Sequence, residues 1–333
     1  MTRDGSSSAR FVARLKTLTT VNQLDPARKT FLLQSLFEAN LIVNQYNTTN
    51  LQEGAIISLE DANLSEIDFQ NRALRYLSLP RSNLTRANFL SSQLSCANLQ
   101  SAVLIEANFH EAAIFLGRSS CFGNFGYTNF GKAILINADL SQAEFISTDL
   151  TGAILTYANM RWFLCLDCVF LNTDMYRTDL SFASVLANST FISTNLTETI
   201  LESTSFKDSI FHAAKFMKNL AIRIKIDRCS LVLTEFQSCV IQQALIRQSN
   251  FSQTHFNNVT LIESTVTDVQ FINTTMQYTN LSSTVFTQCT FINVNFTDAV
   301  TQNASFLNCT FQQSLISQEQ LLKATSFEGS IFL

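Results

Sequence analysis

The chain has 333 residues, a formal net charge of −4 and 46% hydrophobic residues. Phe is abundant, with 29 residues, whereas the chain has only 8 Gly and 2 Pro. The mild charge argues against a polyanionic surface and against a strongly basic surface that binds nucleic acid. No stretch approaches the roughly 18 apolar residues that span a membrane as a helix.

Residues 1–23 are Ser-rich at first and then basic, with Arg3, Arg10, Arg14 and Lys16 among a few apolar side chains. We interpret this segment as a basic, partly disordered leader with one short helix, because Asp4 interrupts the positive charge and no secretory apolar core follows. The alternative is a targeting helix or a helix that lies on a membrane surface.

Residues 24–50 are predicted to hold an N-terminal capping helix and a linker. Asp25 is a good N-cap, and Pro26 is favoured at the first helical position. Apolar residues then recur at three- and four-residue spacing, including Leu33, Leu36 and Phe37, so one helix face needs a surface to cover. We expect this helix to cover the open end of the structure that follows.

A repeat of five residues extends over residues 51–333. Its most regular position, here called the centre, holds a Leu, a Phe or another large apolar residue. Centres run from Leu59 to Ile114, from Phe125 to Val185 and from Phe191 to Leu321, with a one-residue slip between runs and Phe327 and Phe332 after a last slip.

Two residues before each centre the side chain is small, as at Thr194, Thr199 and Thr204. A large and a small residue that both recur every fifth position must point into the same narrow interior, and the charged residues between them must face water. Several cysteines occupy the small inward position, where Cys behaves as a compact buried apolar residue: Cys168, Cys229, Cys239, Cys289 and Cys309.

The repeat resembles the pattern of the pentapeptide-repeat family, which is a small residue, Asp or Asn, Leu or Phe, and two free positions. The segments that carry the resemblance include Ser82-Asn83-Leu84, Ala87-Asn88-Phe89, Ala97-Asn98-Leu99 and Ala138-Asp139-Leu140. It implies an all-β solenoid, a right-handed quadrilateral β-helix of pentapeptide repeats, here with an N-terminal α-helical cap. About thirteen coils at a strand spacing of ~4.8 Å would make a rod on the order of 60 Å long. The leader is similar to that of membrane-anchored members of the family.

Two segments break the repeat. Residues 115–124 are interpreted as a bulge where the coils change phase, the alternative being a loop for phosphate or stacked bases. In residues 161–168, Phe163 takes a small position and Cys165 the following centre, so large and small residues trade places at nearly constant volume. We interpret this exchange as local repacking, and the alternative is a redox or metal site at the C-x-x-C pair Cys165 and Cys168.

The sequence predicts no enzyme. His110, His212 and His255 occupy outward positions far apart along the repeat, so they form no catalytic arrangement with Ser, Cys or Asp. We assign no catalytic residue, no cofactor and no metal ligand.

Charge concentrates between residues 207 and 247. At twenty residues per coil, Lys207, Asp227 and Arg247 fall in one column, and Asp208 and Arg228 fall in the next. We interpret these charges as a solvated face or as a candidate patch that docks a partner. Its cations are Lys207, Lys215, Lys218, Arg223, Lys225, Arg228 and Arg247. Ala221, which is a weak centre, and Ile224, which is large for a small position, predict a local distortion beside this patch.

The resulting hypothesis is a non-enzymatic structural scaffold, a protein–protein interaction rod that presents flat β-helix faces to an unknown protein partner. The alternative, which rests on the resemblance, is a DNA mimic that binds the DNA site of a topoisomerase. Phe327 and Phe332 near the C-terminus predict a homodimer through the C-terminal coil. We expect no direct binding of nucleic acid. We expect a cytoplasmic location, with membrane association through the leader or an upstream segment as the alternative.

Overall fold

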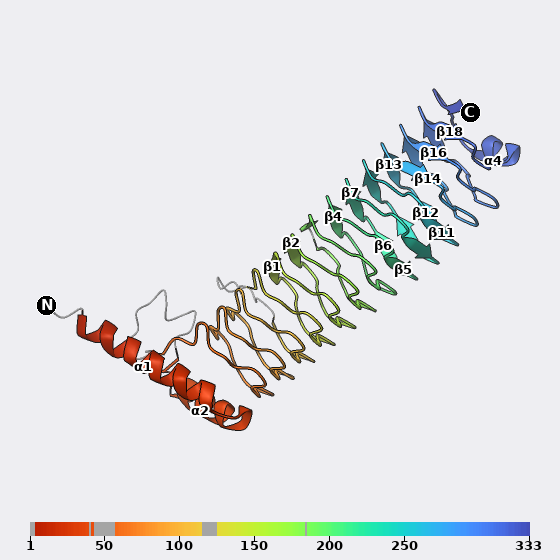
Figure 1. Ribbon diagram of the computed structural model, residues 1–333. Coiled ribbons are helices and arrows are strands. Elements are labelled where there is room, and N and C mark those ends of the chain that lie inside the picture. Colours follow the sequence, from red (N-terminus) through yellow and green to blue (C-terminus); the bar gives the residue numbers. More distant parts are fainter. Residues whose placement is uncertain (1–3, 40, 43–56, 115–124, 184) are drawn as a thin grey trace. The chain divides into compact units, whose positions relative to one another are not determined.

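The computed structural model describes residues 4–39, 41–42, 57–114, 125–183 and 185–333 (Figure 1). The chain divides into two compact units, Met1–Ile154 and Leu155–Leu333. Both units are built from the same five-residue repeat, and only the first contains the N-terminal helices.

The first unit begins with helix α1 (Asp4–Gln23) and helix α2 (Pro26–Glu38). Asp25 is the N-cap of α2, and its side chain accepts a hydrogen bond of 3.0 Å from the backbone N–H of Arg28. This hydrogen bond lowers the pKa of the Asp25 carboxyl below its usual value. The predicted start of the capping helix is confirmed, whereas the leader forms a longer helix than the single short one expected.

Helix α2 contacts the repeats of its own unit. Its Leu33 is buried, and the backbone N–H of Asp68 donates to the Thr30 hydroxyl at 2.9 Å. Helix α1 also reaches the repeats, because Arg14 donates to the carbonyl of Glu60 at 2.9 Å. The prediction that an N-terminal helix covers the repeats is therefore confirmed (Figure 1).

Twenty residues make one turn with four sides. Four successive positions, each five residues apart, pair in parallel with residues twenty positions later: Asn63 with Asn83, Asp68 with Asn88, Ala73 with Gln93 and Ser78 with Asn98. Because every side pairs with the next turn at the same spacing, the chain forms a parallel, four-sided β-solenoid. The predicted fold class is confirmed.

The corners of the turns have a left-handed backbone. Every fifth residue has a positive φ, for example 56° at Arg81 and 57° at Arg86, although most of these residues are not glycine. This conformation costs a residue with a side chain roughly 1 kcal/mol. Many of these corners donate their backbone N–H to the next turn, as Arg86 does to the carbonyl of Ile105 at 2.9 Å.

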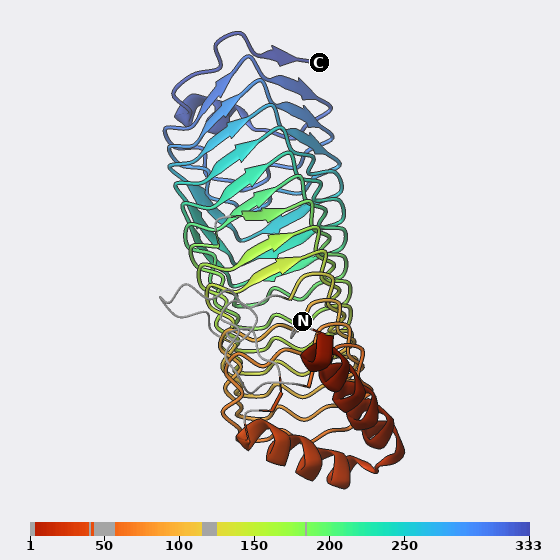
Figure 2. The same ribbon diagram turned by 90° about the vertical axis from the view of Figure 1, so that its left-hand side faces the viewer.

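The second unit adds short parallel strands on all four sides, and its successive turns stack with their strands in the same direction (Figure 2). We name each side by its strands. The long face contains β2-β3-β4-β7-β10-β13-β15-β17, the β5 face β11-β8-β5, the β6 face β12-β9-β6, and the β14 face β14-β16-β18-β19. The first unit has strand β1 (Glu144–Ile146).

The strands of the long face are β2 (Leu164–Leu166), β3 (Val185–Ala187), β4 (Ser205–Lys207), β7 (Lys225–Asp227), β10 (Leu245–Arg247), β13 (Thr265–Thr267), β15 (Val285–Thr287) and β17 (Ser305–Leu307). Those of the β5 face are β5 (Lys215–Met217), β8 (Glu235–Gln237) and β11 (His255–Asn257). Those of the β6 face are β6 (Leu220–Ile222), β9 (Val240–Gln242) and β12 (Thr260–Ile262). Those of the β14 face are β14 (Gln270–Ile272), β16 (Thr290–Ile292), β18 (Thr310–Gln312) and β19 (Ile331–Phe332).

Stacked aromatic rings and small polar side chains fill the interior. The ring centroids of Phe291 lie 5.1 Å from Phe271 and 4.8 Å from Phe311, in nearly parallel planes. Threonines at the small position donate a hydrogen bond from their buried hydroxyl to a carbonyl of the preceding turn, as Thr204 does to Leu180 at 2.9 Å. Such bonds pair the buried hydroxyls of many turns, whereas the Ser181 hydroxyl is buried without a hydrogen-bond partner among the described residues.

The pairing between neighbouring turns shows where the five-residue repeat changes phase. Val103 pairs with Asn129, which is more than twenty positions away. The bulge that we predicted over residues 115–124 lies outside the described residues. At the second slip, Cys165 pairs with Leu186, whose side chain is buried. The assignment of Val185 as a centre is therefore wrong by one residue.

The C-terminal repeat includes a short helix. Helix α4 (Gln318–Lys323) has a capping box between Ser317 and Gln320, so Leu321 is a helical residue and not an inward centre as predicted. Phe327 and Phe332 then resume the columns, stacked at 5.0 Å on Phe306 and at 4.8 Å on Phe311. The predicted return of the repeat is confirmed.

Candidate interaction surfaces

The structure distributes the seven predicted patch residues over several sides of the second unit. All seven side chains are exposed. Lys207, Lys225 and Arg247 lie on strands of the long face, and Arg228 lies at the corner that follows β7. The other three lie elsewhere: Lys215 is on β5, Lys218 is at the corner after β5, and Arg223 is at the corner after β6. The predicted set therefore contains one group of four neighbours and three separate cations.

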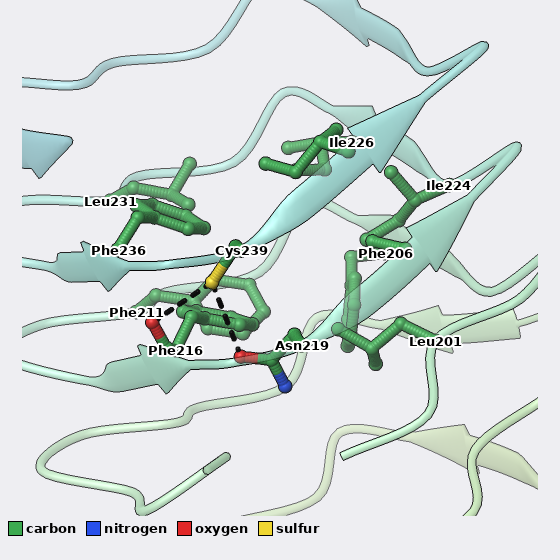
Figure 3. Close-up of a pocket in the computed structure, with 12 residues that line it drawn as sticks. Leu201, Phe206, Phe211, Phe216, Asn219, Ile224, Ile226, Leu231, Phe236 and Cys239 are labelled. Carbon is green, nitrogen blue, oxygen red and sulfur yellow. Dashed lines mark hydrogen bonds between the residues drawn. The ribbon is translucent and has the colours of Figure 1, made fainter. Parts of the chain in front are cut away.

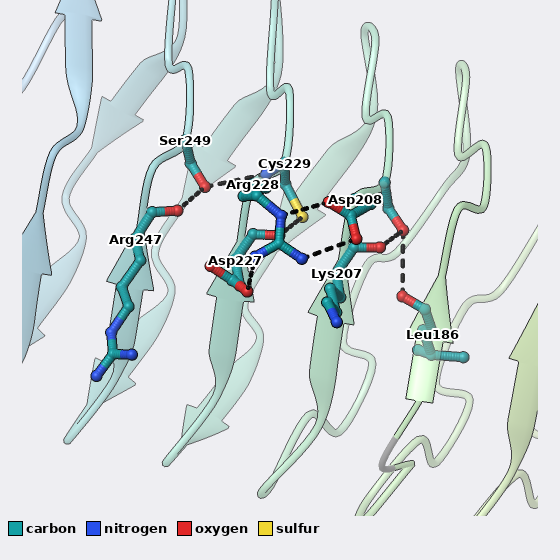
Figure 4. Close-up of polar contacts among 9 residues, drawn as sticks. Leu186, Lys207, Asp208, Asp227, Arg228, Cys229, Arg247 and Ser249 are labelled. Atoms are coloured by element: carbon teal, nitrogen blue, oxygen red, sulfur yellow. Dashed lines mark hydrogen bonds and ion pairs between the residues drawn. The ribbon is translucent and has the colours of Figure 1, made fainter.

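The charge ladder on the long face has the predicted register (Figure 4). Lys207 pairs with Asp227, and Asp227 pairs in turn with Arg247, on the parallel strands β4, β7 and β10. Lys225, at the start of β7, lies between Ser205 and Leu245. The prediction of one column with alternating sign is confirmed.

Arg228, in the second column, binds carboxylates of both columns. Its guanidinium donates to Asp208 at 2.6 and 2.9 Å and to Asp227 at 2.8 Å. The hydrogen bonds from Arg228 lower the pKa of the Asp208 carboxyl, and those to Asp208 raise the pKa of Arg228. Both carboxylates of this group are thus engaged by one arginine.

Three cations of the long face have no such partner. Within the part of the chain that the structure describes, the ion pairs of this group all involve Arg228. Lys207, Lys225 and Arg247 therefore present their charge to water at fixed positions along a flat sheet. The group of Lys207, Lys225, Arg228 and Arg247, here called the cationic ladder, carries more positive charge than Asp208 and Asp227 compensate.

The cations outside the ladder have other neighbours. Arg223 donates to Glu202 at 2.6 Å, and the Lys218 amine lies 3.9 Å from a carboxylate oxygen of Glu198. Lys215 pairs in register with Glu235 on the β5 face. These residues do not extend the cationic ladder.

Comparison with known proteins agrees with the repeat geometry. The family model "Pentapeptide repeats" matches in eight copies, over residues 62–95, 124–161, 267–300 and 279–318. The chain contains pentapeptide repeats. No curated protein matches the sequence.

Solved structures similar to this chain include HetL, which is involved in the regulation of heterocyst differentiation in the cyanobacterium Nostoc sp. strain PCC 7120. HetL is 16% identical, over 78% of this chain and 88% of its own, with a TM-score of 0.24. QnrB1, a plasmid-mediated fluoroquinolone resistance protein, is 14% identical over 79% and 91%, with a TM-score of 0.33. Rfr23 from the cyanobacterium Cyanothece 51142 is 22% identical over 44% and 95%, with a TM-score of 0.16. Likeness at these levels assigns no function to this chain.

The interior of the pentapeptide repeats contains a cavity of about 20 Å³ beside the ladder (Figure 3). Ala221 occupies a centre there, and Asn219 occupies the small position. The Asn219 amide donates to the carbonyls of Leu196 and Thr199 at 2.6 and 3.0 Å. The predicted distortion is therefore a packing defect, with room for about one water molecule among mainly apolar walls.

The cysteines in the described part of the chain are buried in the repeat interior. Cys165 and Cys168 form a disulfide, so the exchange of large and small residues near Phe163 includes a covalent link at the C-x-x-C pair for which redox chemistry was the alternative. Burial raises the pKa values of Cys229 and Cys239 to about 11. Among the described residues, no three His, Cys, Asp or Glu side chains gather as a metal site.

The described helices include none with the length and apolar character needed to cross a membrane. His212 and His255 lie exposed on different sides of the second unit, on the β14 face and on β11. Their outward orientation was predicted from the repeat.

Proposed function

We propose that this protein is a non-enzymatic scaffold that docks an acidic segment of a partner protein on the cationic ladder. The observation that carries the proposal is the fixed set of exposed cations, Lys207, Lys225 and Arg247, on the parallel strands of the long face. Strands hold these charges at a spacing of ~4.8 Å. Acidic side chains on an extended segment could meet them at a similar spacing.

The rigidity of the solenoid supports this proposal. The centres beneath the ladder, Phe206, Ile226 and Ile246, are buried, and each strand pairs with the strands of the turns before and after it. Because the backbone is held on both sides, the ladder needs little ordering when it binds, which reduces the entropic cost of association.

The same surface gives little support to the DNA-mimic alternative. A mimic of the duplex presents regularly spaced negative charge, as DNA does. Here the acidic residues Asp208 and Asp227 are both bound by Arg228, and Lys207, Lys225 and Arg247 surround them. The local charge has the wrong sign for that role.

The proposal is tested by capture of partners from native lysate with the intact protein and two variants. The first variant is Lys207→Glu/Lys225→Glu/Arg247→Glu. The control is Arg28→Glu/Lys132→Glu/Lys215→Glu, which reverses as many exposed cations outside the ladder. We expect an acidic partner to bind the intact protein and the control and to be lost from the ladder variant. Equal capture by all three proteins would refute a role for the ladder.

The pairing of two copies through the C-terminal coil remains a second, separate prediction. Ile331, Phe332 and Leu333 are 54%, 49% and 75% exposed at this end, and Leu322 on α4 is 78% exposed. An exposed apolar group of this kind is typical of a contact surface. Light scattering on the intact protein and on Phe332→Glu tests whether this end joins two copies.

A further inference from the structure

A row of aliphatic side chains faces water on the β6 face. Ile200, Leu220 and Val240 occupy the same outward position in three successive turns, where Ile200 pairs with Leu220 and Leu220 with Val240. Their side chains are 40%, 45% and 38% exposed. Outward positions in a solvated sheet are normally polar, so this row needs an explanation.

Charges of alternating sign line both edges of the row. At the corner before the β6 face, Glu198 is followed one turn later by Lys218, whose Nζ lies 3.9 Å from Glu198 Oε1. On the opposite edge, Glu202 is followed one turn later by Arg223, which donates to it at 2.6 Å. Along each edge, a negative charge in one turn is therefore followed by a positive charge in the next. An apolar centre with a charged rim is the usual anatomy of a protein interface.

We propose that the β6 face binds a second copy of this chain, related by a two-fold axis that runs parallel to the strands between the turns of Ile200 and Leu220. This axis reverses the order of turns in the second copy. It places Ile200 against Leu220 of the second copy, and Leu220 against Ile200. Ile200 and Leu220 of each copy then cover those of the other, and Val240 lies opposite Asp179 of the second copy, the residue one turn before Ile200.

Charge complementarity selects this arrangement. The reversed order places Glu198 opposite Lys218 of the second copy and Glu202 beside Arg223 of the second copy. A two-fold axis along the solenoid would instead place Lys218 opposite Arg223 and Glu198 near Glu202, and like charges that face each other oppose association. The face is therefore complementary to itself only in the antiparallel order.

The repeat also favours a second copy over an unrelated surface. Turns follow one another at a fixed strand spacing of ~4.8 Å, so two β6 faces match in period over several turns without adjustment. A two-fold contact uses the same residues twice, which doubles the effect of each favourable pair. This inference does not depend on the cationic ladder, which lies on the long face.

The first test is sedimentation equilibrium of the intact protein, of Leu220→Glu and of the matched control Ile210→Glu. Ile210 is 47% exposed at the equivalent outward position of the β14 face. We expect the intact protein and the control to dimerise, and Leu220→Glu to associate about a hundredfold more weakly because its carboxylate would be buried in the contact. A monomeric intact protein, or equal association of all three, would overturn the proposal.

The second test separates contacts between copies from contacts within one copy. Arg223→Glu alone places the new carboxylate beside Glu202 of the second copy, and Glu202→Arg alone places two guanidinium groups together, so each variant should self-associate about tenfold more weakly. Mixing the two variants restores opposite charges across the contact, and the mixture should form a heterodimer. Failure of the mixture to associate more strongly than either variant would overturn the arrangement, even if both variants fold.

Discussion

The interior of the solenoid is filled differently at the turn around Ala221 and at the turns around Phe291. At Phe291 the centre is filled by a ring that stacks on the rings of both neighbouring turns. At Ala221 the centre is only a methyl group, and a cavity of about 20 Å³ remains. The solenoid thus tolerates a poorly filled turn between well-filled ones.

Hydrogen bonds compensate in part for the missing ring. Asn219 lines the same cavity as Ala221. Its amide donates to two carbonyls of the preceding turn and accepts from the thiol of Cys239 at 3.5 Å (Figure 3). In the C-terminal repeat, Gln320 makes an equivalent pair of bonds to the carbonyls of Phe296 and Ala299. The comparison indicates that a buried amide can replace a regular small residue where the neighbouring centre is absent or altered.

The largest effect should come from removing a ring from a well-filled turn. Phe291→Ala leaves a cavity between Phe271 and Phe311, and we expect the free energy of unfolding to fall by about 3–5 kcal/mol. Urea denaturation monitored by circular dichroism measures the change. A loss below about 1 kcal/mol would show that the stacked turns collapse around a void as readily as the turn at Ala221 does.

Much of this architecture could be predicted from the sequence. The five-residue period identified the inward centres, the small inward cysteines and the column that joins Lys207, Asp227 and Arg247, because a fixed number of residues per turn converts sequence spacing directly into position. The N-cap of α2 followed from Asp25 and Pro26. These predictions depend on local chemistry or on the period alone.

The remaining features depend on events that the period does not encode. Val185 was misassigned because a single inserted residue moves the inward position to Leu186. The grouping of Lys215, Lys218 and Arg223 with the cationic ladder ignored the corners that separate one side from the next. The left-handed corners at residues such as Arg81 also lack a sequence signal, because hydrogen bonds to the next turn support them whatever the side chain.

A smaller effect is expected at the poorly filled turn itself. Asn219→Ala removes the donor to the carbonyls of Leu196 and Thr199 and leaves them buried without that partner. We expect a loss of about 1–3 kcal/mol in the free energy of unfolding. Thr199→Ala, at the small position of the preceding turn, is the matched control, since its hydroxyl supplies one bond, to Met175 at 3.0 Å. A smaller loss from Asn219→Ala than from the control would contradict a compensating role for the amide.

Filling the cavity should have the opposite sign. Ala221→Val adds apolar atoms beside the void, and we expect a gain of about 1 kcal/mol in the free energy of unfolding. The same urea titration measures it, with Ala214→Val as the control because Ala214 is fully buried at a well-packed small position. The control should destabilise by overpacking. Destabilisation by both substitutions would mean that the walls of the cavity cannot adjust to a branched side chain.

The smallest effect concerns the outer surface of the same turn, where Arg228 binds Asp208 of the turn before. The pKa of Asp208 is lowered in the folded protein by its hydrogen bonds to Arg228. A carboxyl whose folded pKa is depressed stabilises the fold above its unfolded pKa, about 3.9, and this contribution is lost as the pH falls through the lower, folded value. Asp208→Asn should therefore unfold at slightly lower urea concentration than the intact protein near neutral pH, and the difference should vanish in acid. Because both side chains are exposed, the difference should also shrink in high salt. A difference that persists unchanged at low pH would show that Asp208 stabilises the turn through its backbone conformation and not through its charge.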